Sequence, residues 1–369
     1  MSDVFWVNYR ATSMDILSKL ERLIEESGVF EDIGSGDIVA VKVHPGLYGS
    51  VRYLRPVYVR KIVEVIKARG GKPFVTETVG HNPMGSRGTA EGYIREMIAN
   101  GFTSETLGAP ILIADGLWGL DEVKIEIDGL KLKETRIASA IAYSDFLVSI
   151  ARVKAHGSAG FAAAIKNVGV GCVSRAGKSR IHFSSGPSIN VKLCDGCSLC
   201  VKYCKLSAIK LRNGIPVIDP SRCNQCLICV NVCPKKALTA DRTEPPETQY
   251  RIADSALAVS KALNGRIAYI NVAVEITPQC DCGRRVDTPI VPDQGIFASR
   301  DPVALDRLVA DKIVAAPGIP GSAAEDAGAL DPGSDKILKI RGTDWRILLE
   351  AAEKIGLGSQ RYHEVFLDI

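Results

Sequence analysis

The sequence lacks strong net charge, long apolar runs and a secretory leader, and each absence excludes a class of protein. A net charge of +4 over 369 residues is mild, so nothing global argues for nucleic-acid binding. The longest apolar stretch, residues 137–151, is interrupted by Ser139, Ser144, Asp145 and Ser149, so it cannot span a bilayer. The first residues show no basic segment followed by an apolar one. We therefore expect neither secretion nor a membrane partner.

The sequence is rich in cysteine: it contains 11, and eight of them lie in two evenly spaced runs. Each run has the spacing C-x2-C-x2-C-x3-C, and the second ends in a proline, Pro234. Bacterial ferredoxins use this spacing, with three cysteines of a run binding one cluster and the fourth binding the other. The runs therefore predict two 4Fe–4S clusters. One is expected on Cys194, Cys197, Cys200 and Cys233, and the other on Cys223, Cys226, Cys229 and Cys204.

Two other uses of cysteine fit this pattern poorly. Zinc ribbons need only four ligands for each metal, and disulfides belong to oxidising compartments. Eight cysteines in a double ferredoxin pattern match neither. Since such clusters need a reducing environment, we expect the protein in the cytoplasm.

The segment that carries the two runs is basic. Residues 186–240 contain eight Lys or Arg and two Asp, and Lys205 stands where the second run has proline. Part of this charge offsets the thiolates of the clusters. The rest predicts an acidic redox partner such as a ferredoxin, or else an ordinary solvated face.

Outside this segment, strands alternate with helices of ten or more residues, which indicates βαβ units. The pattern predicts an α/β fold with a mostly parallel sheet and flanking helices, interrupted by an inserted ferredoxin-like domain. The expected boundaries are 1–185 for the first part of the α/β domain, 186–240 for the insert and 241–369 for the second part. Strands are expected at 3–9, 37–43, 73–77, 111–114, 146–150 and 267–274, and helices at 57–69, 89–100, 250–263, 301–314 and 345–355.

Local signals predict several element ends. Thr12-Ser13 is expected to cap the first helix, and Asp301 with Pro302 to begin a later one. Asp128-Gly129 predicts the turn of a hairpin over residues 123–133. The final residues are expected to form a docked tail.

Polar residues follow the predicted strands, at the edge where α/β sheets bind ligands. Four of the five histidines lie there, and only His363 lies elsewhere. Lysines in the same loops, with Lys42, favour a small anionic substrate. The candidate catalytic residues are His44, Lys154, His156, Lys166 and Lys178; the other two histidines are His81 and His182.

The segment Gly171–Ser179 superficially resembles a phosphate-binding loop. A Walker motif needs four residues between its glycines, whereas Gly171 and Gly177 enclose five. ATP binding is therefore not expected. The glycines with Lys166, Arg175 and Lys178 could still form a more general anion-binding nest.

Three cysteines remain outside the two runs: Cys172, Cys280 and Cys282. Residues two apart in an extended segment project to the same side, so Cys280 and Cys282 could bind one metal or cluster, completed by Cys172 and a histidine such as His156 or His182. They could instead be buried thiols, or a redox dithiol facing the insert.

Several motifs together resemble the prokaryotic family of domain-of-unknown-function proteins numbered 362, in a version with an inserted two-cluster ferredoxin. The resemblance covers about residues 35–315 and implies an uncharacterised iron–sulfur protein, without supplying a reaction. The motifs that carry it are Lys42-Val-His44-Pro-Gly46, Ala114-Asp-Gly-Leu117, Lys166-Asn-Val-Gly-Val-Gly-Cys172, Gly177-Lys178, Cys280-Asp-Cys282 and Asp301-Pro-Val-Ala-Leu-Asp306.

The sequence leaves three functions open. The leading hypothesis is a redox enzyme in which two clusters relay electrons to a ligand or metal site on the α/β domain. The alternative is a non-catalytic electron carrier or metal-centre assembly module that docks to partner proteins. In the third, the clusters are purely structural.

Overall fold

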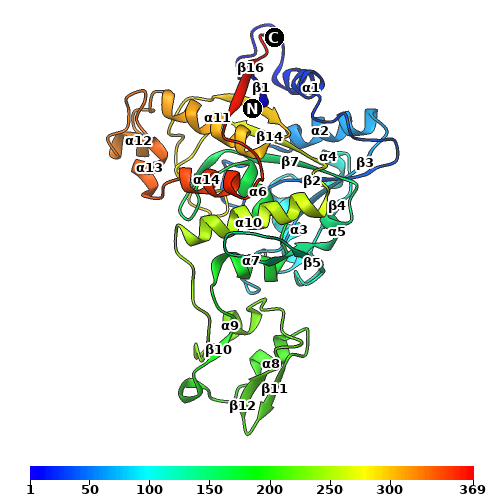
Figure 1. The fold of residues 1–369 in the computed structure, drawn as a ribbon, viewed down its shortest axis with the longest axis vertical. Helices are drawn as coiled ribbons and strands as arrows, with labels where there is room; N and C mark the ends of the chain where they lie inside the picture. The colour runs from blue at the N-terminus through cyan, green and yellow to red at the C-terminus, as the bar shows by residue number, and fades with distance from the viewer.

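The computed structural model describes residues 1–369, and its main body is built on an eight-stranded sheet (Figure 1). The strand order is β16-β1-β15-β14-β7-β2-β3-β4, and every neighbouring pair is parallel except the two that involve β15. The mostly parallel α/β fold expected from the sequence is confirmed. The strands are β1 (Ser2–Val7), β2 (Ile38–Lys42), β3 (Lys72–Glu77), β4 (Ile111–Ile113), β7 (Phe146–Arg152), β14 (Ile267–Ala273), β15 (Gly295–Ser299) and β16 (Tyr362–Phe366).

Helices cover both faces of the sheet and form two cores. One face packs 34 buried residues under α1 (Ile16–Ser27), α2 (Pro56–Ala68), α3 (Ala90–Ala99) and the short α4 (Ser104–Leu107). The other face packs 49 buried residues. The helices on that side include α6 (Ala164–Gly169), α7 (Arg175–His182), α10 (Glu247–Ala262), α11 (Pro302–Ala315), α13 (Lys336–Arg341) and α14 (Arg346–Lys354); α5 (Ser139–Ala142) and α12 (Ala323–Asp326) are single turns.

The central strands explain how the sheet serves both cores. All seven residues of β7 and of β14 are buried. Neighbouring residues face opposite cores, as pleated strands require: Leu147 belongs to the larger cluster and Val148 to the smaller. A strand covered on both faces reads as a continuous apolar run, which is why these strands are visible in the sequence.

Residues 186–240 leave this body as a separate projection, the cysteine-rich lobe (Figure 1). The chain leaves after α7 and returns to α10, and the two segments pair at the neck through Ser184 N–H to Asp241 O at 2.8 Å. The lobe holds η1 (Val191–Leu193), α8 (Leu199–Tyr203), α9 (Ile228–Val232) and the small strand pairs β10 (Ser188–Ile189) with β13 (Leu238–Thr239) and β11 (Ile209–Arg212) with β12 (Ile215–Ile218).

Two local expectations differ from the structure. Asp15, not Thr12-Ser13, caps α1, because its carboxylate accepts the free N–H groups of Leu17 and Ser18 at 3.0 and 3.1 Å. The predicted hairpin exists as β5 (Glu122–Glu126) and β6 (Glu134–Ala138), but Asp128-Gly129 is not a two-residue turn. Instead the longer loop is held by Asp254 of α10, which accepts three backbone N–H groups at 2.7 to 2.8 Å.

The end of the chain is more ordered than a docked tail. β16 pairs in parallel with β1 and forms the edge of the sheet. At the start of α11, Asp301 caps the helix as expected, accepting from Val303 and Ala304 N–H at 2.8 and 3.0 Å.

None of the helices is both long enough and apolar enough to cross a membrane.

Candidate functional site

A cavity of about 290 Å³, the central pocket, lies at the carboxyl ends of the sheet strands. Its walls come from both sides of the boundary between β2 and β7, where the strand order reverses. Ligands of open α/β sheets bind at such switch points. The polar and charged side chains that line it are Lys42, His44, Glu77, Thr78, His81, Arg87, Tyr93, Arg152, Lys154, His156, Lys166, Asn167, Lys178, His182, Cys280 and Cys282.

The pocket brings together residues that lie more than a hundred positions apart in the sequence. All five candidate catalytic residues line it, namely His44, Lys154, His156, Lys166 and Lys178. So do the other two loop histidines that the sequence pointed to, His81 and His182. His363 lies apart, on the edge strand β16, where it pairs with Asp3.

Glu77, at the end of β3, is the anionic centre of one wall. Its carboxylate pairs with Lys42 Nζ at 2.7 Å and His44 Nδ1 at 3.1 Å, and it accepts the Tyr93 hydroxyl at 2.6 Å. Burial acts to raise the pKa of Glu77, but the positive charges of Lys42, His44 and Lys178 outweigh it and hold the pKa well below its usual range. Glu77 is therefore a permanent carboxylate that positions Lys42 and His44.

Asp281 plays the same part on the opposite wall. It is fully buried and pairs with Lys154 Nζ at 3.0 Å and Arg152 Nε at 3.4 Å, and His44 Nε2 lies 3.6 Å from it. Although burial opposes ionisation, Lys154, His44 and Arg152 keep the pKa of Asp281 far below its usual range. Its charge fixes the loop that follows β14 against the pocket.

Lys178 forms a third buried group with Asp115. Its ammonium donates to the Thr78 hydroxyl and to Val173 O, the latter at 2.8 Å. Burial lowers the pKa of Lys178 to about 8 and raises that of Asp115 to about 7, and each group's charge opposes the other's shift. A lysine and a carboxyl that both titrate near neutrality could hold or release a proton at this wall.

The remaining charge of the pocket is positive and unpaired. The Lys166 ammonium makes no hydrogen bond or ion pair within the protein. Burial acts to lower the pKa of Lys166, but the charges of Cys280, Cys282 and Asp281 outweigh it and raise the pKa. Burial, together with neighbouring cations, lowers the pKa of three pocket histidines to about 3, so these rings are neutral. They are His81, His156 and His182. A pocket with a free lysine and two internally paired carboxylates can bind a small anion.

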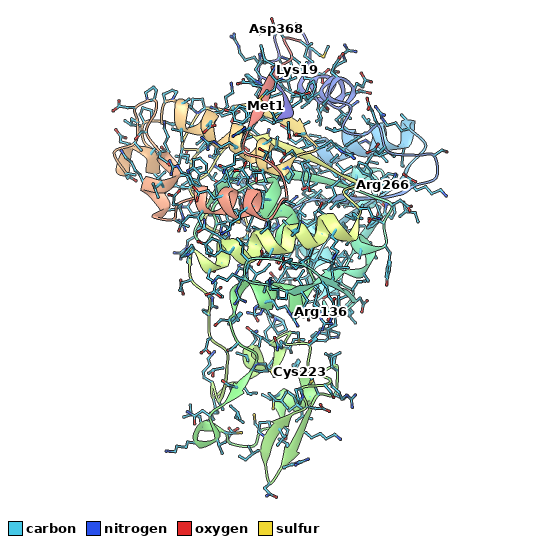
Figure 2. All side chains as sticks on the ribbon, in the orientation of Figure 1. Met1, Lys19, Arg136, Cys223, Arg266 and Asp368 are labelled. Carbon is cyan, nitrogen blue, oxygen red and sulfur yellow. The ribbon has the colours of Figure 1, made fainter.

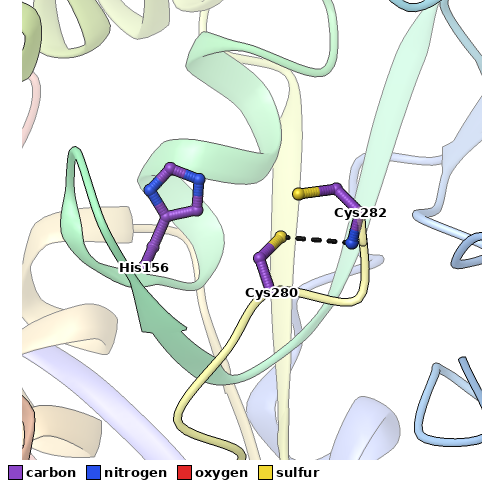
Figure 3. Close-up of side chains that lie close together, drawn as sticks. All are labelled: His156, Cys280 and Cys282. Atoms are coloured by element: carbon purple, nitrogen blue, oxygen red, sulfur yellow. Dashed lines mark hydrogen bonds between the residues drawn. The ribbon is translucent and has the colours of Figure 1, made fainter. Parts of the chain in front are cut away.

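Cys280 and Cys282 reach the pocket from the loop after β14, beside His156 of β8 (Lys154–His156), which pairs with β9 (Gly160–Ala162) (Figure 3). The two sulfurs and a ring nitrogen of His156 all lie within 4.8 Å of one another. Cys280, Asp281 and His44 form a second such group. Both groups have the chemical character of a metal site.

The two thiols are not equivalent. Cys282 N–H donates to Cys280 Sγ at 3.4 Å, and Cys282 is exposed whereas Cys280 is half-buried. The Cys280 thiol, and then Lys166 and Arg87, lower the pKa of Cys282 to about 6 against the effect of burial. The same thiol contact and burial raise the pKa of Cys280 to about 12. A thiolate at Cys282 next to a protonated thiol at Cys280 is therefore the stable state near neutrality.

Two residues grouped with this site in the sequence lie outside it. Cys172 is completely buried in the larger core, where burial raises its pKa to about 12, and it belongs to neither metal-type group. Arg175 is also fully buried, and it donates to Trp118 O at 2.9 Å, Gly80 O at 2.8 Å and His81 O at 2.6 Å. It stiffens the wall of the pocket and is not free to bind an anion, so the expected nest reduces to Lys166 and Lys178.

In the cysteine-rich lobe, the eight cysteines surround two separate cavities. Each cavity is lined by four of them, three from one run and the fourth from the other. A small shared core of Cys200, Ile209, Cys229 and Leu238 lies between them. The first set is Cys194, Cys197, Cys200 and Cys233, and the second is Cys204, Cys223, Cys226 and Cys229.

The two cysteine loops repeat one backbone conformation. Gly196 and Ser198 of the first loop have positive φ, and so do Gln225 and Leu227 at the same places in the second. The side chains of Asp195 and Asn224 accept equivalent hydrogen bonds, from Cys197 N–H at 3.2 Å and Cys226 N–H at 3.1 Å. A side chain such as leucine is costly in this conformation, which persists where function requires it. Alternating backbone of this kind turns N–H groups inward around an anionic group.

The second set of cysteines lies on the side of the lobe that faces the body, and Cys223 marks this side in Figure 2. Asn224 connects the two parts: its carbonyl accepts from Arg180 of α7 and its amide donates to Glu122, both at 3.0 Å. The Lys205 ammonium, which replaces the expected proline, lies 4.7 Å from the centre of the Trp118 ring. α7 therefore contacts the lobe through Arg180 and the pocket through Lys178 and His182.

Sequence reasoning missed two residues of this site. Tyr93 and Met97 lie four residues apart on α3, so the sequence pattern indicates a pair of core residues. The structure adds that the Tyr93 hydroxyl donates to Glu77. Glu122, which holds Asn224, sits on a hairpin strand with no motif around it. No signal in a single sequence distinguishes it from a surface acid.

Comparisons with known proteins identify a family but no activity. The family model described as "Domain of unknown function (DUF362)" matches residues 39–311. Two solved structures are similar: the lactate racemase apoprotein from Thermoanaerobacterium thermosaccharolyticum and a protein from Thermotoga maritima. Their identities are 15% and 10%, each with a TM-score of 0.38 over 74% and 92% of this chain. The chain spans 51% and 58% of their lengths. A search of curated proteins finds no match.

Proposed function

The chain belongs to the family described as domain of unknown function DUF362, and from this premise we propose that it is an iron–sulfur electron-transfer protein that serves the central pocket. In this proposal the lobe binds two 4Fe–4S clusters, which relay electrons to a terminal redox or metal centre in the pocket. When bound, such clusters supply one-electron transfer at low potential. The protein would then be an oxidoreductase of the cytoplasm, where thiols stay reduced.

The observation that carries the proposal is the division of the eight cysteines. Two cavities, each lined by four cysteines in the combination that the spacing predicts, suit two four-iron clusters. The repeated positive-φ backbone of the loops suits the same groups, since it directs N–H donors toward a shared anionic centre. A zinc ribbon explains neither the exchange of the fourth ligand between runs nor this repeated conformation.

The surroundings of the two cysteine sets suggest a direction for the electrons. The first set lies at the far end of the lobe with α8, β11 and β12, and Cys197 is exposed there (Figure 1). Exposed apolar side chains such as Val191 and Leu193 lie next to it in the sequence. In the lobe as a whole, all eight basic residues are exposed. An acidic redox protein such as a ferredoxin suits this tip. The second set contacts α7, whose other side lines the pocket.

The pocket residues have distinct roles in this proposal. Lys166 binds a small anionic substrate, helped by Lys42 and Lys154, whose charges are positioned by Glu77 and Asp281. His44 bridges those two carboxylates, 3.1 and 3.6 Å away. Lys178, whose pKa is influenced by the charge of Asp115, can deliver a proton, and His156 faces the thiols of Cys280 and Cys282.

The first experiment measures iron and acid-labile sulfide in anaerobically purified and reconstituted protein. We expect about eight of each per chain, and about four after Cys197→Ser or Cys226→Ser, one from each set. Cys172→Ala is the matched control, because this cysteine is buried in the body, and it should keep all eight. Colourless protein without sulfide after reconstitution would refute the clusters.

A second experiment separates the redox enzyme from the carrier or assembly module. Cys280→Ser and His156→Ala change the pocket without touching the lobe. Both variants should keep their iron and accept electrons from a low-potential donor, but lose substrate-dependent reoxidation. If every cluster-dependent activity survives in both, the pocket takes no part, and the protein is a carrier.

A further inference from the structure

The loop that carries Cys280 and Cys282 is built to hold two thiols side by side. Asp281 between them is fully buried, and its ion pairs with Lys154 and Arg152 direct its side chain into the body. Its carbonyl also accepts from Leu47 N–H at 3.0 Å. Cys280 to Gly283 form a turn closed by Gly283 N–H to Cys280 O at 3.1 Å, and with Asp281 held by its ion pairs both cysteines line the pocket.

The sulfur atoms are close enough to react with each other. They lie within 4.8 Å, against about 2 Å in a disulfide, and rotation of two short side chains can close that gap. The exposed Cys282 is accessible from the pocket, and the half-buried Cys280 lies behind it. An accessible thiol backed by a second one is the arrangement of a redox-active pair.

The hydrogen bonds of His156 argue against a metal ligated by this imidazole. Its Nδ1 accepts from the backbone N–H groups of Ser158 and Ala159, both at 3.2 Å. The neutral ring therefore carries its proton on Nε2, and Figure 3 shows that this nitrogen faces the cysteines. Metal-binding histidines show the reverse pattern, donating from one nitrogen so that the other is free to ligate. Here the ring offers an N–H donor to the sulfurs.

The charges around the pair point the same way. Both carboxylate oxygens of Asp281 are occupied by Lys154 and Arg152, which leaves neither free for a metal in the second group. The unpaired Lys166 lines the same pocket, and Arg87 donates to the Cys282 carbonyl at 2.8 Å. Such cations repel a divalent ion, whereas they stabilise a thiolate.

We propose that Cys280 and Cys282 are a dithiol–disulfide pair that takes up two electrons in the central pocket. On reduction the bond between the two Sγ atoms breaks, and two electrons and one proton from solvent convert the disulfide into the Cys280 thiol and the Cys282 thiolate. The His156 Nε2–H keeps its proton and stabilises the thiolate as a hydrogen-bond donor. In the protein the electrons come from two one-electron carriers in the lobe, and this step rests on the proposed function. In vitro a reduced dithiol such as dithiothreitol supplies both electrons and becomes its cyclic disulfide.

The short spacing fits a pair that cycles. A disulfide between residues two apart closes a small, strained ring and gains little from restricting the unfolded chain. Strained disulfides are easily reduced and act as catalytic or regulatory groups. Such a bond is therefore opened without a large driving force.

The test equilibrates anaerobic, cluster-containing protein in buffers of reduced and oxidised dithiothreitol, then quenches with acid and alkylates with N-ethylmaleimide. The tryptic peptide 267–284 contains Cys280 and Cys282 and no other cysteine, so its adducts report on the pair alone. We expect two adducts at the reducing end, none at the oxidising end and a single two-electron transition between them. Two adducts at every potential would overturn the proposal.

Variants and metal analysis of the same samples sharpen the result. Cys280→Ser and Cys282→Ser should each show one adduct under all conditions, and Cys172→Ala should behave as the unaltered protein. His156→Gln, whose amide N–H can replace the ring donor, should keep the pair and its rate of reduction, whereas His156→Ala should slow the reduction because the Cys282 thiolate loses its hydrogen-bond donor. One equivalent of zinc or nickel in the folded protein, with alkylation of the pair at neutral pH and without the acid quench blocked until a chelator removes the metal, would show a metal site and overturn the dithiol.

A third measurement separates this inference from the proposed function. Iron and sulfide are determined on each sample, and one set is reduced by a photochemical one-electron donor without dithiol. Reduction of the pair that is lost in Cys226→Ser supports both. If the pair responds to dithiothreitol but the protein cannot bind iron, only the electron relay is refuted. If the protein binds eight irons but the pair never forms a disulfide, only this inference is refuted.

Discussion

The ion pair between Lys42 and Glu77 offers the sharpest test of how the pocket is held together. Lys42 and Glu77 are 1% and 7% exposed at the side chain, and their charged atoms lie 2.7 Å apart. At an effective dielectric constant of about 20, this separation gives an attraction of about 6 kcal/mol, most of it offset by the loss of hydration of both groups. Removing one partner leaves the other charge buried, which typically costs 3–5 kcal/mol.

We therefore predict that Lys42→Met and Glu77→Gln each lower the free energy of unfolding by about 3–5 kcal/mol, and that the double variant loses much less than the sum. The assay is urea unfolding of the four proteins, followed by tryptophan fluorescence and circular dichroism, with agreement of the two signals as the check for two-state behaviour. The coupling energy should be about 2 kcal/mol or more.

The exposed pair Arg60–Glu64 is the matched control for this cycle. Its atoms are 2.9 Å apart, nearly as close, but the side chains are 49% and 47% exposed. Its coupling should be about 0.3–0.5 kcal/mol. If the buried pair couples no more strongly than this surface pair, burial does not set the strength of the interaction, and the account of Glu77 as an organising carboxylate is wrong.

Three further predictions concern other parts of the molecule. Stability should fall between pH 6.5 and 5, because burial lowers the pKa of His81 and His182 to about 3 and the unfolded chain alone takes up protons there. Each histidine contributes at most about 2 kcal/mol at pH 5, and a melting temperature that stays constant over this range would contradict it. Asp254→Ala should cost about 3 kcal/mol and speed hydrogen exchange of the three amides that it accepts at least tenfold; unchanged exchange would exclude its role. Lys205→Met should shift the emission of Trp118 and weaken docking of the lobe by about 0.5–1 kcal/mol, with iron content unchanged.

The sequence reveals the sheet and the edge that carries the pocket, for a physical reason. Strands buried on both faces are continuous apolar runs, as in β2 and β7, so their carboxyl ends can be located from the sequence. Parallel strands bring those ends to one edge. The sequence therefore predicts that residues as distant as His44 and His156 lie at one edge of the sheet, and both line the pocket.

Glycine hides the two helices that complete the site. α6 and α7 contain Gly169 and Gly177, and the tract reads as loop because glycine weakens helices. In the structure a side chain at Gly169 would meet Ile252 of α10, and one at Gly177 would meet Val173 and the Arg136 carbonyl. These glycines serve close packing, which depends on neighbours distant in the sequence. A tract without visible periodicity can therefore still be helical.

The same limit applies to the leftover cysteines. Cys172 and Cys280 are both thiols next to polar motifs, and the sequence grouped them in one site. Burial separates them: Cys172 faces the core beneath α6, while Cys280 is turned to the pocket by the fixed carboxylate of Asp281. Which way a loop cysteine points is set by ion pairs across the fold, and these cannot be seen in spacing alone.

The position of α7 explains why a lobe of 55 residues could serve a pocket in another part of the chain. Its eight residues present Arg180 to the lobe and Lys178 and His182 to the pocket, so one short helix contacts both. His81 in the pocket wall accepts or donates at Ser179 of the same helix, 3.0 Å away, and stacks on Phe183 at the neck. A change in charge at the second cysteine set would therefore act on a helix that also lines the pocket. If electrons pass between lobe and pocket, substitutions in α7 that preserve both ends, such as Ser179→Ala, should alter the rate of transfer while leaving iron content and the Cys280–Cys282 adducts unchanged.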